Sequence, residues 1–174
     1  MTQINAFIEN TYPDFEIDDV VVLDNVQKIT NYILKDEEIF SKSCLVDCEF
    51  ESISFDIVLC NNEDIHRINR DYRNKDSATD VITFAMFADS PEEERFIIDD
   101  DVALGEIIVS LDKIKEQSIE NNVTFESELY YLISHGILHL LGFDHQTQEE
   151  YDFMVNNQNK AKAIVLWQDL NHQV

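Results

Sequence analysis

The spacing of apolar residues along this chain switches between a strand-like and a helix-like period. Ile53, Phe55 and Ile57 alternate with polar residues before the chain becomes continuously apolar, which predicts a strand that ends buried on both faces. Apolar residues at helical spacing predict a helix over residues 26–34. Further short strands are expected where β-branched or alternating apolar residues gather, at residues 4–8, 81–84 and 104–109.

Polar residues at helix-start positions divide the remaining chain. Capping side chains are expected at Asn61 or Asn62, at Ser110 and at Thr124, each ahead of a helix. Thr147 and Glu150 have the spacing of a capping box, which predicts the start of a final helix. The acidic segment 89–101 has no clear period and is expected to be a loop.

The predicted order of elements is β-α-β-α-β-β-α-α-α. No segment has the composition of an interdomain linker, since the chain has two prolines, three glycines and no repeat. We therefore expect an α+β fold: one domain over residues 1–174, with a mixed sheet of about four strands packed with helices.

Charge restricts the partners that this fold can have. Thirty-six acidic and twelve basic residues give a net charge of −24, and a field of that sign repels nucleic acids and anionic membranes. No apolar run approaches the roughly 18 residues that span a bilayer, and the first residues do not resemble a secretory leader. The three cysteines are odd in number and favour free thiols. We expect a cytoplasmic protein with no membrane partner and no DNA partner.

One short segment has the opposite charge. Four cations lie within nine residues, with a single acid among them: Arg67, Arg70, Arg73 and Lys75. Positions 67, 70 and 73 recur at i+3, close to one face of a helix. This segment is either a local RNA-binding strip or simply a mildly basic helix on an acidic surface.

The richest chemistry lies in residues 135–145. His135 and His139 are four apart, so on a helix their imidazoles project from the same face. Gly142 can end that helix, and the chain can then return His145 to the same point. Three neutral imidazoles with no obvious fourth protein ligand predict a catalytic metal site with an open position. One Zn²⁺ suits this set best, although other divalent transition metals (cobalt, nickel, copper) are possible.

The histidine spacing is that of a zincin-like metal-site helix, but one residue differs. In zincin proteases a glutamate follows the first histidine and serves as general base, whereas here that position is Gly136. Peptide hydrolysis suffers most from this loss, while RNA cleavage depends less on it because RNA supplies its own hydroxyl. Asp144 either orients a ligand or carries a proton, or it only caps local backbone amides.

Three motifs together resemble the YbeY family. The segment His135–His145 resembles that family's H-G-x-L-H-L-x-G-x-D-H signature, residues 69–84 its N-x-x-Y-R-x-K-D-x-x-T-D-V-L-S-F block, and residues 104–107 its L-G-D-I strand. The departures are Ala78 and Ala85, where the family often has proline, and Glu106 in place of aspartate. The motifs appear in family order and cover roughly residues 60–150.

The resemblance implies a metal-dependent, single-strand-specific endoribonuclease that acts in ribosomal RNA maturation and ribosome quality control. Its expected partners are ribosomal RNA and the small ribosomal subunit. By position, His135, His139 and His145 would be the metal ligands, and Arg73 would face the metal cleft and stabilise charge on the phosphate. Two alternatives are a ribosome-assembly factor with a mainly structural metal and a metalloprotease-like peptidase.

Overall fold

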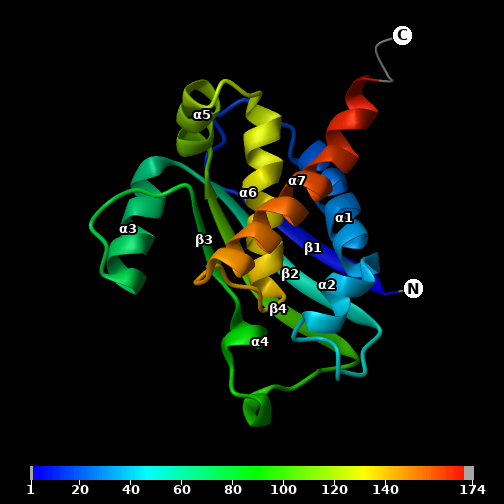
Figure 1. The fold of residues 1–174 in the computed structure, drawn as a ribbon. Coiled ribbons are helices and arrows are strands. Elements are labelled where there is room, and N and C mark those ends of the chain that lie inside the picture. The colour runs from blue at the N-terminus through cyan, green and yellow to red at the C-terminus, as the bar shows by residue number, and fades with distance from the viewer. Residues whose placement is uncertain (1, 171–174) are drawn as a thin grey trace.

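The computed structural model describes residues 2–170, with side chains over residues 2–166. It has one four-stranded sheet in the order β1-β2-β4-β3 (Figure 1). The strands are β1 (Gln3–Asn10), β2 (Ser52–Cys60), β3 (Val81–Phe84) and β4 (Asp101–Ser110). β1, β2 and β4 run parallel, whereas β3 pairs antiparallel with β4 at the edge of the sheet. The predicted mixed sheet of about four strands is confirmed.

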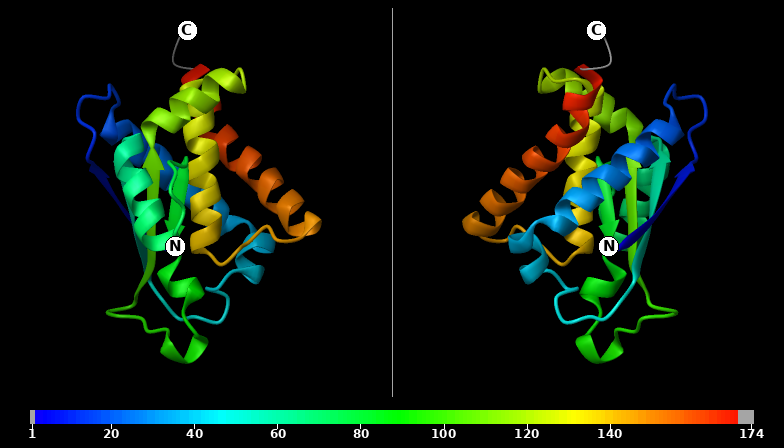
Figure 2. Two further views of the ribbon diagram at one scale, coloured as in Figure 1. Left: turned by 90° about the vertical axis from the view of Figure 1, so that its left-hand side faces the viewer. Right: turned by 90° about the vertical axis from the view of Figure 1, so that its right-hand side faces the viewer.

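Helices lie on both faces of this sheet. They are α1 (Asp19–Lys35), α2 (Glu37–Lys42), α3 (Asn62–Arg73), α4 (Met86–Asp89), α5 (Leu111–Glu120), α6 (Phe125–Leu140) and α7 (Gln148–Leu170), with a 3₁₀ turn over Glu92–Glu94. Figure 2 shows α6 and α7 on one side of the sheet and α3 on the other. The α+β class predicted from the sequence is therefore confirmed.

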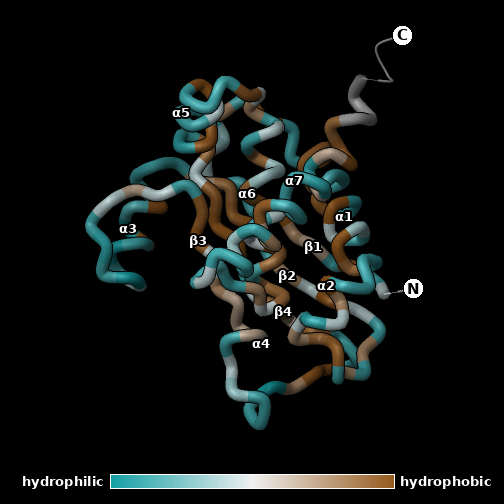
Figure 3. Tube along the Cα trace, viewed as in Figure 1, coloured by the Kyte–Doolittle hydropathy of each residue, from teal (hydrophilic) through white to brown (hydrophobic). Residues whose placement is uncertain are grey.

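The main core lies between the sheet and the α1–α6–α7 layer. Ile53, Phe55, Ile57 and Leu59 of β2 are buried on this side, while Asp56 between them is exposed on the other. This is the alternation that the sequence predicted, because successive side chains of a strand point to opposite faces. Figure 3 shows the strands as apolar and α3 as largely hydrophilic, as expected for a helix that covers only a corner of the sheet.

Helix starts agree well with the capping predictions. Asn61, Ser110 and Thr124 each accept a backbone hydrogen bond at the start of α3, α5 and α6. Thr147 and Glu150 form the complete capping box: the Thr147 amide donates to the Glu150 carboxylate, and the Glu150 amide donates to the Thr147 hydroxyl. These local signals set where the histidine helix and its neighbour begin.

Other boundaries differ from the sequence prediction. α1 begins at Asp19, seven residues earlier than expected, because Asp18 accepts hydrogen bonds from the amides of Val20 and Val21 and caps it there. The expected loop 89–101 is not free of structure: it follows α4 and contains the 3₁₀ turn and a bridge between Ile98 and Asp101. No helix within residues 2–170 combines the length and apolar character needed to cross a membrane.

Candidate metal centre

α6 places His135 and His139 one turn apart on the same face. The helix ends in a hydrogen-bond pattern of the Schellman type: the Gly142 amide donates to the carbonyl of His139, and the Phe143 amide donates to that of Leu138. Gly142 has φ +95°, a backbone conformation that glycine adopts without strain. The motif reverses the chain directly after the second histidine, as predicted.

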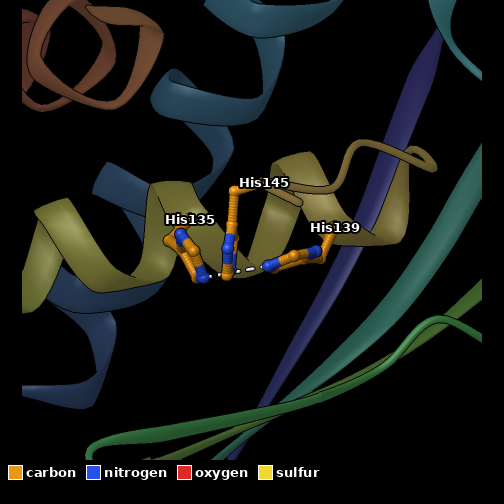
Figure 4. A group of neighbouring side chains, drawn as sticks. All are labelled: His135, His139 and His145. Carbon is orange, nitrogen blue, oxygen red and sulfur yellow. Dashed lines mark hydrogen bonds between the residues drawn. The ribbon is translucent and has the colours of Figure 1, made fainter. Parts of the chain in front are cut away.

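His145 returns from this turn to the other two histidines. Figure 4 shows the three side chains pointing toward one another, two from α6 and one from the loop that follows. The Nε2 atoms of His135 and His139 are 2.9 Å apart, and one nitrogen from each of the three rings lies within 4.8 Å of the others. His135 and His139 are half-buried and His145 is exposed, so the cluster opens to solvent on one side. The sequence prediction that these three residues meet is confirmed.

Burial suits the two helical histidines to metal binding. Burial and, second to it, the neighbouring His139 lower the pKa of His135 to about 4. The pKa of His139 is also lowered, first by burial and then by His145. Both rings are therefore neutral at pH 7, the form that donates a lone pair to a metal ion. Three converging imidazole donors and one open side fit a transition-metal ion, so this group could hold one.

Gly136 lies between the two helical ligands in the sequence and faces β4. A Cβ atom at this position would lie 2.8–3.0 Å from the side chain of Ile107 in β4. The glycine thus lets α6 approach the sheet closely. The position that carries the general base in zincins is, in this fold, a contact between helix and sheet.

Arg73 lies at the end of α3 and reaches the exposed edge of the sheet. Its Nη2 donates to the carbonyl of Thr83 at 3.3 Å. Thr83 pairs with Ile107, and Ile107 contacts Gly136 between the two helical ligands. Arg73 is close enough to contribute to the lowered pKa of His139. The guanidinium therefore lies on the β3 side of the histidine cluster.

The other three cations of the strip have different surroundings. Arg67 pairs with Asp64 at 2.9 Å and Arg70 with Asp71 at 3.0 Å, both on the exposed side of α3. Within residues 2–166, neither Arg73 nor Lys75 has a carboxylate within salt-bridge distance. The strip predicted from the sequence thus divides into two arginines paired with carboxylates and two cations without a carboxylate partner among residues 2–166, of which Arg73 acts on His139.

Asp144 is exposed and bonded to its own loop. Its carboxylate accepts from the backbone amide of His145 at 2.8 Å and from the side-chain amide of Gln146 at 2.7 Å. These two hydrogen bonds lower its pKa, so it is ionised at pH 7. The local-cap interpretation of Asp144 describes these contacts, while the charge remains next to His139 and His145.

Two residues near the cluster were not predicted from the sequence. Gln158 of α7 is buried and its side-chain oxygen lies 3.4 Å from Nδ1 of His135. Asp80, before β3, acts electrostatically on His135 and is held by the amide of Val81 and the side chain of Gln117. Gln158 is 23 residues from His135 in the sequence, so no local pattern connects the two.

Comparison with known proteins gives a consistent result. The family model described as "Endoribonuclease YbeY" matches residues 7–164. The Endoribonuclease YbeY of Clostridium perfringens (strain ATCC 13124) is 36% identical over 157 residues, covering 83% of this chain and 86% of that protein. The Endoribonuclease YbeY of Bacillus pumilus is 46% identical over 106 residues, covering 60% of this chain and 67% of that protein.

A solved structure has the same fold. The solution structure of TM1509 from Thermotoga maritima aligns with a TM-score of 0.59 at 25% identity, covering 98% of this chain and 93% of that one. The matching family and relatives are named as endoribonucleases, which indicates that this protein is an enzyme, a nuclease of the hydrolase class. The resemblance inferred from the histidine, arginine and strand motifs is confirmed, and the chain belongs to the Endoribonuclease YbeY family.

Proposed function

We propose that this protein is a metal-dependent endoribonuclease that cuts single-stranded RNA during ribosomal RNA maturation and ribosome quality control. One observation carries the proposal: three imidazoles converge on one solvent-open point beside an unpaired arginine, in a chain of the YbeY family. The proposed setting is the cytoplasm, the proposed partners are ribosomal RNA and the small ribosomal subunit, and the proposed working unit is one domain over residues 1–174.

His135, His139 and His145 would hold the metal, and their donor set favours one Zn²⁺ ion. When bound there, such an ion supplies Lewis-acid chemistry to a phosphodiester. The lowered pKa values of His135 and His139 keep both rings available as ligands at neutral pH.

Arg73 is the proposed phosphate-binding residue. Its guanidinium has no carboxylate partner among residues 2–166, so its charge is free to stabilise the negative charge that develops on the phosphate during cleavage. Lys75 and, more weakly, the carboxylate-paired Arg67 and Arg70 would hold the RNA backbone on either side. Asp144, ionised beside His145, is the proposed proton carrier.

The packing of α6 favours RNA over peptide as the substrate. A peptidase of the zincin type needs a carboxylate at position 136, where this protein has a glycine packed against Ile107. RNA cleavage requires mainly a positioned phosphate and compensation of its charge, which the histidine cluster and Arg73 can provide.

The test is cleavage of a fluorescent single-stranded RNA by purified protein of known metal content. Wild type should cut this RNA but not the matched duplex or single-stranded DNA, and chelation should abolish cutting until metal is restored. Arg73→Ala should retain the metal and lose about 100-fold in kcat. Lys115→Ala removes an exposed cation on α5 and should cut at the wild-type rate.

Two outcomes would overturn the proposal. One is full activity in Arg73→Ala, or wild-type activity that chelation does not change. The other is tight binding to small ribosomal subunits without cleavage at any metal loading, which would instead support an assembly factor with a structural metal. The ion pairs of Arg67 and Arg70 favour this assembly-factor candidate, because an arginine that is paired with a carboxylate attracts RNA less strongly.

A further inference from the structure

Gln158 connects the α7 helix to the first histidine of the cluster. Its side chain is 2% exposed and lies where α7 packs on α6. The amide oxygen is 3.4 Å from Nδ1 of His135, and the amide nitrogen is 3.4 Å from the backbone carbonyl of Tyr131, one turn earlier in α6. The amide therefore bridges the His135 ring and the backbone of α6 one turn earlier.

The chemistry of these partners fixes the direction of both hydrogen bonds. A backbone carbonyl can only accept, so the Tyr131 oxygen must face the NH₂ group of Gln158. The amide oxygen of Gln158 then faces His135 and can only accept. Nδ1 of His135 must therefore carry the proton, which leaves Nε2 with its lone pair free.

The free lone pair is on the side of the ring that faces the cluster. Nε2 of His135 is the atom that lies 2.9 Å from Nε2 of His139. We propose that Gln158 is a positioning residue: it holds His135 in the Nδ1–H tautomer and aims Nε2 at the point where the three histidines meet. This inference rests on the proposed metal site, which it deepens by naming the residue that prepares one ligand.

The second helical ligand is held differently. His139 is hydrogen-bonded to the backbone of Phe143, in the turn that Gly142 creates. His135 depends on a side chain from another helix, and a substitution can remove that side chain. Asn157 is next to Gln158 and 5% exposed, and among residues 2–166 its side chain bonds only to the carbonyl of Phe153 within α7. Asn157→Leu is therefore a matched control for loss of a buried amide.

The first measurement is the tautomer of His135 in metal-free protein labelled with ¹⁵N-histidine, from long-range ¹H–¹⁵N spectra at pH 7. Wild type and Asn157→Leu should show His135 with the proton on Nδ1. Gln158→Met, which has similar length but no acceptor oxygen, should show a substantial Nε2–H population, with the proton between the two Nε2 atoms. Retention of the pure Nδ1–H tautomer in Gln158→Met overturns the proposal.

The second measurement is metal affinity by Co²⁺ titration, followed in the visible spectrum. Gln158→Met should bind Co²⁺ about 10- to 100-fold more weakly than wild type and with an altered spectrum. Gln158→Glu retains an acceptor for Nδ1–H and should restore the tautomer and bring affinity to within about threefold of wild type. If Asn157→Leu weakens binding as much as Gln158→Met, or if Gln158→Glu fails to rescue either property, Gln158 has only a packing role.

These readouts separate the inference from the proposed function. Neither uses RNA, so a protein that binds Co²⁺ with the expected pattern but cuts no RNA supports the role of Gln158 and contradicts the nuclease proposal. If wild type binds no Co²⁺, the proposed metal site fails, and the tautomer comparison alone decides whether Gln158 positions His135. If Gln158→Met does not fold, Gln158→Glu is compared with wild type instead. Loss of the Nδ1–H tautomer or of Co²⁺ affinity in Gln158→Glu then overturns the proposal.

Discussion

Single residues at the end of α6 determine whether the three histidines meet. Gly142 has φ +95°, and an added Cβ would lie 3.5 Å or more from its nearest neighbours, Cys44 and Ala88. Space is therefore available at this position, and the restriction is conformational. The sequence alone predicted this glycine and the three ligands, because ligand spacing and helix termination are local properties of the chain.

We predict that Gly142→Ala costs about 1–2 kcal/mol of folding free energy and also weakens Co²⁺ binding. The alanine resists the left-handed conformation, so the turn shifts and moves His145 away from the α6 pair. Urea unfolding and a Co²⁺ titration measure the two effects.

Asn122→Ala is the matched control for Gly142→Ala. Asn122 has φ +53° in the turn between α5 and α6, far along the helix from the histidines. It should lose a similar stability without a change in Co²⁺ affinity. Equal losses of affinity in both variants would show that the turn at Gly142 has no specific role in placing His145.

The elements follow their sequence signals where those signals are local. β3 was predicted over its observed bounds, and the starts of α3, α5, α6 and α7 were marked by capping residues. The short helices α2 and α4 were missed, because they carry too few residues for an apolar period to appear. The contacts of Gln158 with His135 and of Gly136 with Ile107 depend on how elements pack, which no local pattern records.

The open face of the sheet carries an unfavourable pair of charges. Asp56 of β2 and Glu106 of β4 are directly opposite each other in the parallel register. Partial burial, followed by the charges of Asp56 and Glu9, raises the pKa of Glu106. Because like charges opposite each other destabilise a sheet, this pair opposes folding when both groups are ionised.

We predict that Glu106→Gln raises the melting temperature at pH 7. A carboxyl group whose pKa is raised by folding binds its proton more tightly in the folded state, so its ionisation destabilises the fold above both pKa values. The gain should shrink as pH falls through the raised pKa of folded Glu106, and it should be nearly gone below about 4, where wild-type Glu106 is mostly protonated in both states. Thermal melts between pH 3 and 7 measure this.

Glu93→Gln gives the comparison for Glu106→Gln, because it removes one charge at an exposed position of the 3₁₀ turn. Its effect at pH 7 should be smaller. A gain for Glu106→Gln that stays constant down to pH 3 would show that the cause is packing and not charge.

At the scale of the whole molecule, salt should act on folding and on RNA binding in opposite directions. At a net charge of −24 the acidic side chains repel one another, which opposes folding. Salt screens this repulsion over a length of about 8 Å at physiological ionic strength. RNA binding would depend on a few cations, of which Arg67 and Arg70 are already paired. Composition alone suggested that this protein would repel RNA. Only the folded chain shows which of the cations have no carboxylate partner among residues 2–166.

We predict that raising NaCl from 50 to 500 mM increases the melting temperature and weakens RNA binding. With two phosphates held by Arg73 and Lys75, the log of the binding constant should fall with the log of salt concentration with a slope of about −1.4. Thermal melts and fluorescence anisotropy on a single-stranded RNA give the two trends. A slope near −3 would mean that all four cations contact phosphate and that the ion pairs of Arg67 and Arg70 open on binding.

The contact between Gly136 and Ile107 has a consequence for how this fold can evolve. A glutamate at position 136 would begin with a Cβ already too close to Ile107 of β4, so the side chain could be admitted only if Ile107 or α6 shifted. Any shift of α6 would move His135 and His139 relative to His145. The glutamate that a zincin peptidase requires would therefore bring a steric cost at the metal-site helix itself. The barrier between the two hydrolytic chemistries is steric, and it lies where α6 packs on β4.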